Sequence, residues 1–199
     1  MISCVHFIKA EISDLGSLEL ILGDADFKNS TINNLKNLEI IGDTADFSYS
    51  DVRRLGKLRK IFGDALFENS DVRNLAQLEY IGGDALFTAD DFGVFGRKSK
   101  ISSLGNLKTI GGEAIFENIC SLRDFGKLEQ VGKGHFTAYD LISGPGGGDP
   151  DRIDDYYEED IIMAHKFEQE FYETKNDNGR TVFLRKKEYL NNNNLENEK

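Results

Sequence analysis

Residues 55–74, LGKLRKIFGDALFENSDVRN, contain the unit from which most of the chain is built. The unit recurs at a spacing of twenty residues, which is clearest from the leucines Leu15, Leu35, Leu55 and Leu75. Further apolar positions recur with the same spacing, and in the quoted unit these are Leu58, Ile61, Ala65 and Phe67. A fixed short period predicts a solenoid, because one unit buries its apolar side chains only when neighbouring units stack against it.

Within a unit, the segment around Leu66 has the alternation of a short strand. Ala65 and Phe67 point to one side and Leu66 to the other, and a Gly-Asp pair that favours a turn precedes them. The following apolar residues recur every three positions, which favours a tight, 3₁₀-like or extended return segment; they are Val72, Leu75, Leu78 and Ile81. The sequence therefore predicts short parallel strands joined by tight returns.

The pattern Ala65-x-Phe67-x-x-Ser70-x-Val72, with its copies twenty and forty residues earlier, resembles the core of the leucine-rich repeat. The unit length is at the short end of that family's range. The sequence pattern of the unit is also similar to the short repeats of receptor L domains and of some bacterial and phage repeat proteins. The resemblance covers roughly residues 5–136. It departs from the family in having Ala for the first strand leucine and Ser for the usual Asn, although a buried Ser hydroxyl still bonds turn backbones.

Composition narrows the classes of function. The 199 residues carry a formal net charge of −11, which argues against a nucleic acid or an anionic membrane surface as the main partner. No stretch has the apolar length of a membrane span, and the N-terminus has no secretory signal. Two distant cysteines, Cys4 and Cys120, argue against a disulfide scaffold. We expect a cytoplasmic protein or a virion component.

Three regions are expected along the chain: a solenoid over residues 1–139, a Gly/Pro-rich linker over 140–151, and an acidic tail over 152–199 with a disordered end. A helix is expected from about Ile153 to Lys166. The turn sequence NDNG then predicts a hairpin of Glu170–Thr174 with Thr181–Arg185, and a continuous helix through Phe171 is the alternative. Little sequence precedes the first strand, so the tail or another chain is a candidate cover for the stack, and assembly through the N-terminal edge is one possibility.

Catalytic signatures were sought and not found. The three histidines have no metal-binding spacing, and the glycine run 144–148 lacks the Lys-Ser/Thr of a phosphate loop. Cys120 is expected to be a buried structural thiol. An acidic column precedes the strands, and we interpret it as a set of turn residues rather than a cation site; it contains Asp24, Asp64, Asp84 and Glu113. No enzyme activity, cofactor or metal is expected.

One surface differs from the repeat background. The outward strand position is held by Asp26 and Asp46 in early units and by Leu66, Leu86 and Ile115 in later ones. The unit after Leu75 is also longer, at 104 − 75 = 29 residues, because of an insertion within Thr88–Lys100. We expect the apolar positions and the insertion to form a binding site, with the insertion contributing Phe92, Phe95, Arg97 and Lys98. The alternative is that the insertion folds over the apolar positions, or that Phe92 and Phe95 enter the core.

These observations lead to the expectation of a leucine-rich-repeat-like β-solenoid with a small α/β or partly disordered tail. Its expected function is non-enzymatic: binding of a protein or peptide, or assembly. Two alternatives are a structural component of a larger phage, viral or host particle, and an acidic inhibitor or immunity-type protein that blocks a basic site.

The repeat register predicts that Leu58→Ala lowers the free energy of unfolding by about 2–5 kcal/mol, because a buried leucine is truncated between stacked units. Lys57→Ala, one position earlier, should leave stability nearly unchanged. Chemical denaturation of both variants measures the difference, and an unchanged midpoint for Leu58→Ala would show that the register is wrong.

Overall fold

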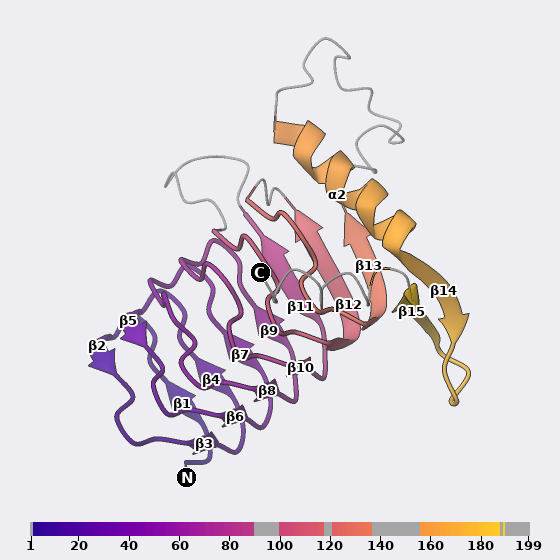
Figure 1. Cartoon of the computed structure of the whole chain (residues 1–199). Helices are drawn as coiled ribbons and strands as arrows, with labels where there is room; N and C mark the ends of the chain where they lie inside the picture. The colour runs from indigo at the N-terminus through magenta and orange to yellow at the C-terminus, as the bar shows by residue number, and fades with distance from the viewer. Residues whose placement is uncertain (1, 90–99, 118–120, 137–155, 188, 190–199) are drawn as a thin grey trace, which may run out of the picture.

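The chain winds into a parallel β-solenoid in the computed structural model (Figure 1). The structure describes residues 2–89, 100–117, 121–136, 156–187 and 189. Six successive parallel pairings relate equivalent residues of neighbouring coils, from Val5 and Ala25 at one end to Ala114 and Gly134 at the other. The predicted twenty-residue stacking and the strand positions are confirmed, and the return segments are extended with tight turns.

Each early coil contributes two short strands to the same sheet. The first strip is made of β1 (Val5–His6), β4 (Ala25–Asp26), β7 (Ala45–Asp46), β9 (Ala65–Leu66) and β11 (Ala85–Thr88). The second strip is made of β3 (Leu20–Ile21), β6 (Ile40–Ile41), β8 (Lys60–Ile61) and β10 (Tyr80–Ile81). The two strips merge because the later strands are longer and span both, as in β12 (Thr109–Glu117) and β13 (Gln130–Phe136).

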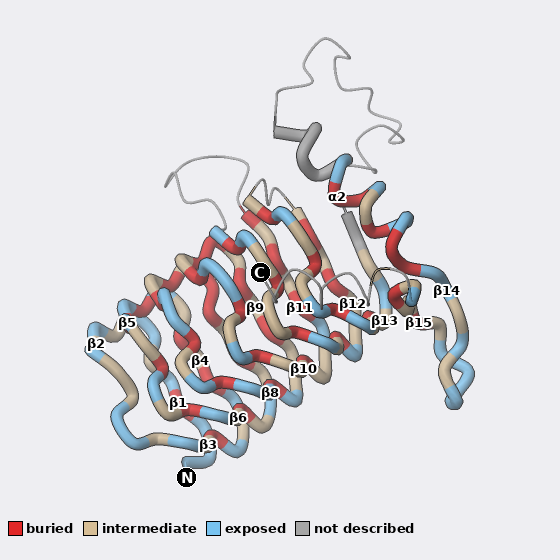
Figure 2. Tube along the Cα trace, viewed as in Figure 1, coloured by how far each residue is buried: buried red, intermediate tan, exposed pale blue. Residues whose placement is uncertain are grey.

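A third side closes each coil. It begins with β2 (Glu11–Asp14) and β5 (Thr31–Asn34), which pair in parallel. Isolated bridges continue the same line through later coils, for example Asn74 with Ser103 and Ser103 with Asp124. The coil therefore has three sides around one apolar interior, and buried residues follow its inner surface throughout (Figure 2).

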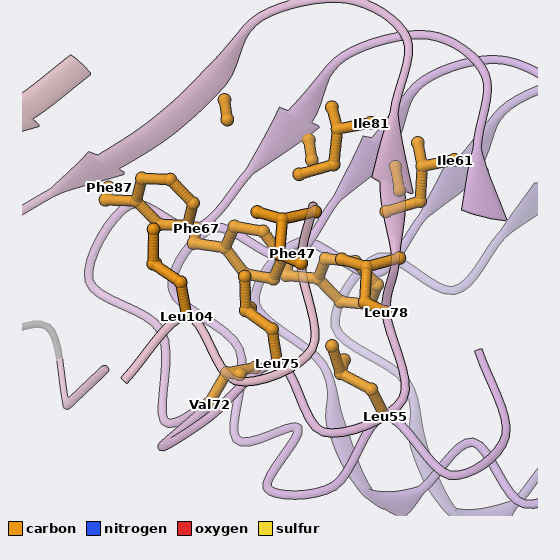
Figure 3. Close-up of a cluster of buried hydrophobic side chains, with 14 of the residues drawn as sticks. Phe47, Leu55, Ile61, Phe67, Val72, Leu75, Leu78, Ile81, Phe87 and Leu104 are labelled. Carbon is orange, nitrogen blue, oxygen red and sulfur yellow. The ribbon is translucent and has the colours of Figure 1, made fainter. Parts of the chain in front are cut away.

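The interior is a set of columns of identical side chains. Phe27, Phe47, Phe67 and Phe87 are fully buried, with ring centroids 5.1–5.5 Å apart and planes within 9° of parallel. Figure 3 shows the last three of these rings in a row. Buried leucines such as Leu55, Leu75 and Leu104 lie next to the rings (Figure 3), and Leu58 has no exposed surface, as the register predicts. Stacked aromatic pairs of this kind add about 0.5–1.5 kcal/mol each beyond the burial of their area.

Polar groups at the coil corners are satisfied locally. The hydroxyls of Ser30 and Ser50 are buried and donate to the carbonyls of Phe27 and Phe47, at 2.6 and 2.7 Å. The predicted bonding of buried serine hydroxyls to turn backbone is thus observed, and the accepting carbonyl belongs to the same coil. The buried hydroxyl of Ser70 makes no such bond within the described part of the chain.

A second corner places one residue of every coil in the left-handed region of backbone space. The positions are Gly16, Lys36, Gly56, Ala76, Gly105 and Gly126, with φ between 48° and 59°. In most coils a side chain two residues earlier accepts the N–H of this residue, as Asn74 Oδ1 does from Ala76 at 3.1 Å. At the first such corner, the hydrogen bond from the Lys36 ammonium and the N–H of Gly16 lower the pKa of Asp14.

The available space at this corner differs between coils. A Cβ on Gly56 would lie 2.5 Å from the carbonyl oxygen of Lys36, and one on Gly126 would lie 2.5 Å from that of Gly105. A Cβ on Gly105 would lie 3.4 Å from its nearest neighbour, the nitrogen of Ala76. The contact therefore requires glycine at position 56, whereas at position 105 glycine only relieves the cost of a positive φ that Lys36 and Ala76 bear in other coils.

The tail joins the solenoid instead of hanging free. Helix α2 (Tyr156–Glu170) is followed directly by β14 (Phe171–Lys175) and β15 (Thr181–Arg185), an antiparallel hairpin. The predicted hairpin is confirmed, and the helix ends at Glu170, four residues later than expected and just before Phe171. The linker at 140–151 and the polar end at 190–199 lie outside the described residues.

The hairpin and helix cover the last coil. β15 pairs antiparallel with β13, and the rings of Phe167 and Phe171 lie edge-on to Phe125 with centroids 5.7 Å away. Gly134 stands in the alanine column because a Cβ there would lie 2.8 Å from the Phe167 ring. The question left open by the sequence is thereby answered: the tail caps the C-terminal end of the stack, at the end opposite the N-terminus (Figure 1).

One buried ion pair ties the cap together. Arg185 and Glu170 are 2.5 Å apart, with side chains only 5% and 6% exposed. The guanidinium also donates to the carbonyl of Gly126 at 2.7 Å, and the Arg185 backbone N–H donates to Glu129 at 2.8 Å. A single arginine therefore joins the helix end, the hairpin and the last coil.

Gly56→Ala should lower the free energy of unfolding by about 2–4 kcal/mol, because left-handed strain and a backbone clash act together. Gly105→Ala is the matched control, with the same φ and free space, and should lose about 1–2 kcal/mol. Chemical denaturation compares the two, and equal losses would contradict the inter-coil contact at Gly56.

Arg185→Met should destabilise the chain by about 3–5 kcal/mol, because it leaves the Glu170 carboxylate buried and unpaired. Replacing both partners, in Glu170→Met/Arg185→Met, should recover part of this loss. Arg180→Met, in the exposed hairpin turn, is the control and should have little effect. A thermal melt of the full chain tests the set, and an unaffected Arg185→Met variant would mean that the cap does not depend on this pair.

Candidate functional site

The outer face of the first strip carries an unbroken line of apolar residues. Strand register pairs Leu66 with Leu86 and Leu86 with Ile115, so the predicted adjacency of these three residues is confirmed. Each is partly exposed, while the alanine and phenylalanine on either side of it face the core. We call these three residues the apolar strip, and from here on 'the strip' means these residues and not the first or second strip of strands. Because the strands beneath it belong to the stacked core, the strip is held on a rigid support.

The coils before the strip carry acids at the same position. Register places Asp46 beside Leu66 and Asp26 beside Asp46. Both carboxylates accept a backbone N–H two residues later, from Lys28 at 3.0 Å and from Ser48 at 2.8 Å. Asp26 also lies 3.9 Å from the His6 imidazole. The aspartates thus serve local turn geometry, and the apolar surface begins at Leu66.

Acidic residues border the strip along its length. Asp64 accepts the N–H of Asp84 at 2.8 Å, and Asp84 accepts that of Glu113 at 2.7 Å, so this column links one coil to the next. On the other border, Glu68 accepts the hydroxyl of Tyr49 at 2.9 Å, and Glu117 pairs in register with Thr88. Asp64 and Asp84 therefore bond the backbone of the next coil, where the sequence analysis expected local turn residues. No group of three or more metal-ligating side chains is found among the described residues.

The insertion is described only at its two ends. On one side, β11 runs to Thr88 and the N–H of Ala89 donates to Glu117 at 3.0 Å. On the other, the Lys100 ammonium lies 2.6 Å from Asp71. The first of these ends continues the strand that carries Leu86. The predicted site residues Phe92, Phe95, Arg97 and Lys98 lie outside the described residues, as does Cys120.

A second exposed apolar group lies on the outer face of the second strip. Leu22 and Phe62 are 53% and 51% exposed, and the Phe62 ring contacts that of Tyr80 at 5.8 Å. The sequence analysis did not single out these residues. A signal was present, because Gly42 holds the same position in the coil between them and Gly82 in the coil after Phe62.

Comparison of the chain with protein-family models, with curated proteins and with solved structures found no match. Within the described part of the chain, no helix has the length and apolar character needed to cross a membrane.

Proposed function

We propose that the chain is a non-enzymatic binding module, related in architecture to leucine-rich repeats, that holds a protein or peptide against the apolar strip. The observation that carries this proposal is the alignment of Leu66, Leu86 and Ile115 on adjacent strands. Contiguous exposed apolar groups bordered by charge are typical of interaction sites.

The dimensions and charges favour a particular kind of ligand. With about 4.8 Å between neighbouring strands, three residues present an apolar line about 10 Å long, which suits two or three apolar side chains of a partner. The borders are acidic, with Asp64, Asp84 and Glu68 among the flanking residues. A ligand segment with basic residues beside its apolar ones matches this pattern.

The insertion completes the proposed site. Its described ends are held by the bond from the Ala89 N–H to the Glu117 carbonyl and by the Lys100–Asp71 ion pair. We assign Phe92 and Phe95 as apolar anchors for the ligand, and Arg97 and Lys98 as groups that meet acidic residues of a larger partner. In the alternative arrangement the insertion covers the strip, and the variants below separate the two.

The charge favours a second candidate function. With a net charge of −11, the chain is suited to covering a basic surface, as an acidic inhibitor or immunity-type protein does. A structural role in a larger particle is the remaining alternative, and it would use the coil stack as a building element.

A peptide library panned against the full chain should enrich sequences that combine apolar and basic residues. Leu86→Glu should weaken binding of the selected peptides roughly tenfold or more, and Phe95→Ala should weaken it less, while both keep the wild-type melting curve. Ile162→Glu changes an apolar residue of α2 that is 62% exposed and serves as the control with unchanged affinity. If Leu86→Glu and Phe95→Ala both destabilise the fold and peptide binding falls only in proportion, the insertion is a lid on the core and the proposal is wrong.

A further inference from the structure

The first coil exposes apolar surface that every later coil buries. Phe27, Ile32, Leu35 and Leu38 have no exposed surface, whereas their equivalents one coil earlier are only partly buried; these are Phe7, Ile12, Leu15 and Leu18. Ile2 and Ile8 are exposed at the same end, by 44% and 51%. Among the described residues, Ile2 and Ser3 add backbone pairing beyond this coil, through the bridge of Ile2 with Ile21 and the bond from the Gly23 N–H to the Ser3 carbonyl.

The backbone of this coil is also open on one side. β1 is the last strand at its edge of the sheet. The N–H groups of Val5 and Phe7 donate to the carbonyls of Asp24 and Asp26, at 3.0 and 2.7 Å. Because backbone groups alternate along a strand, the N–H and C=O of His6 point away from the stack. An edge strand with such groups is a template for another strand.

The opposite end of the sheet is closed. There, β14 is the outer strand, and it carries the exposed charged residues Glu173 and Lys175 at the edge of the cap. Charged side chains on an edge strand oppose pairing with a further strand. A copy of the chain therefore finds a receptive edge at one end only, and such an arrangement closes as a dimer instead of growing into a fibre.

We propose that the first coil pairs with the first coil of a second copy of this chain about a two-fold axis, with β1 antiparallel to its counterpart and His6 at the centre. The segment Cys4-Val5-His6-Phe7-Ile8 is self-complementary in this arrangement. Val5 lies opposite Phe7 of the second copy on the core side, and Cys4 lies opposite Ile8 on the outer side. The phenylalanine column of each copy then continues into an apolar neighbour.

Electrostatics agrees with this pairing. Residues 2–8, ISCVHFI, contain no Asp, Glu, Lys or Arg, so the two-fold axis brings no fixed like charges together. Each copy nevertheless has a net charge of −11, and long-range repulsion between copies is screened by salt. Dimerisation should therefore strengthen as the salt concentration rises. The inference is independent of the proposed binding function, because the interface uses none of the residues of the apolar strip.

Light scattering coupled to size-exclusion chromatography of the full chain should give twice the chain mass of 22.4 kDa. His6→Pro removes the outward N–H at a position where an edge strand tolerates proline, and it should weaken the dimer roughly tenfold or more without loss of the folded state. Ile8→Lys places a charge at the interface and should act in the same direction. Ile162→Lys, on the exposed face of α2, is the control and should leave the dimer intact. A wild-type chain that stays monomeric at every protein and salt concentration overturns the proposal, as does a dimer that both interface variants leave intact.

A cross-link tests the register. In a Cys4→Ser/Cys120→Ser background, His6→Cys places two thiols at the two-fold axis, where opposite Cα atoms of a hydrogen-bonded antiparallel pair are about 5.5 Å apart and within disulfide range. Mild oxidation should give a covalent dimer of this variant, and Asp26→Cys, one coil further in, should give none. Absence of the His6→Cys cross-link in a dimeric preparation would place the interface elsewhere and overturn the proposal.

Discussion

The distance between neighbouring parallel strands, about 4.8 Å, is the constraint on which the rest of this structure depends. Every side chain meets its equivalent one coil away at nearly this distance. The phenylalanine rings adapt by lying almost parallel, with centroids 5.1–5.7 Å apart from Phe7 to Phe116. At two turns the spacing leaves no room for a Cβ, since one on Gly42 or Gly82 would lie 2.0 or 2.2 Å from the carbonyl of the preceding coil, although Leu22 and Phe62 hold the equivalent position in other coils. The twenty-residue period follows, because each column accepts only the side chains that stack at this spacing.

The same constraint leaves the ends of the stack unfinished, and the two ends differ. Near the C-terminal end, Phe125 holds the position that Leu104 has one coil earlier, and its ring lies edge-on to that of Phe116 at 65°. Phe167 and Phe171 then cover Phe125, while the Arg185–Glu170 pair satisfies the exposed carbonyl of Gly126. The first coil has no comparable cover among the described residues, and its partly buried apolar side chains are the physical basis for assigning it to self-association.

Residue type can vary most on the outer faces, because an outward side chain does not pack between coils and only its size is restricted. Asp26 and Asp46 use this position to hold their own turns, and the change to leucine at position 66 gives up that bond. Leu22 and Phe62 likewise stand, largely exposed, at a position that glycine holds in the next coil. These outward apolar side chains are not buried in the core. This is why we assign ligand recognition to the outer surface.

The sequence by itself determined the coil, the inward columns and the adjacency of Leu66, Leu86 and Ile115, because a strict period converts sequence spacing directly into spatial neighbours. The exposure of Leu22 and Phe62 was readable by the same comparison of columns. Only the tertiary structure decided that Lys36 and Ala76 adopt left-handed backbone angles, that α2 ends at Glu170, and that the hairpin completes the sheet. Those features rest on contacts between segments with no common period, such as Arg185 with Gly126, and no local pattern of residues specifies them.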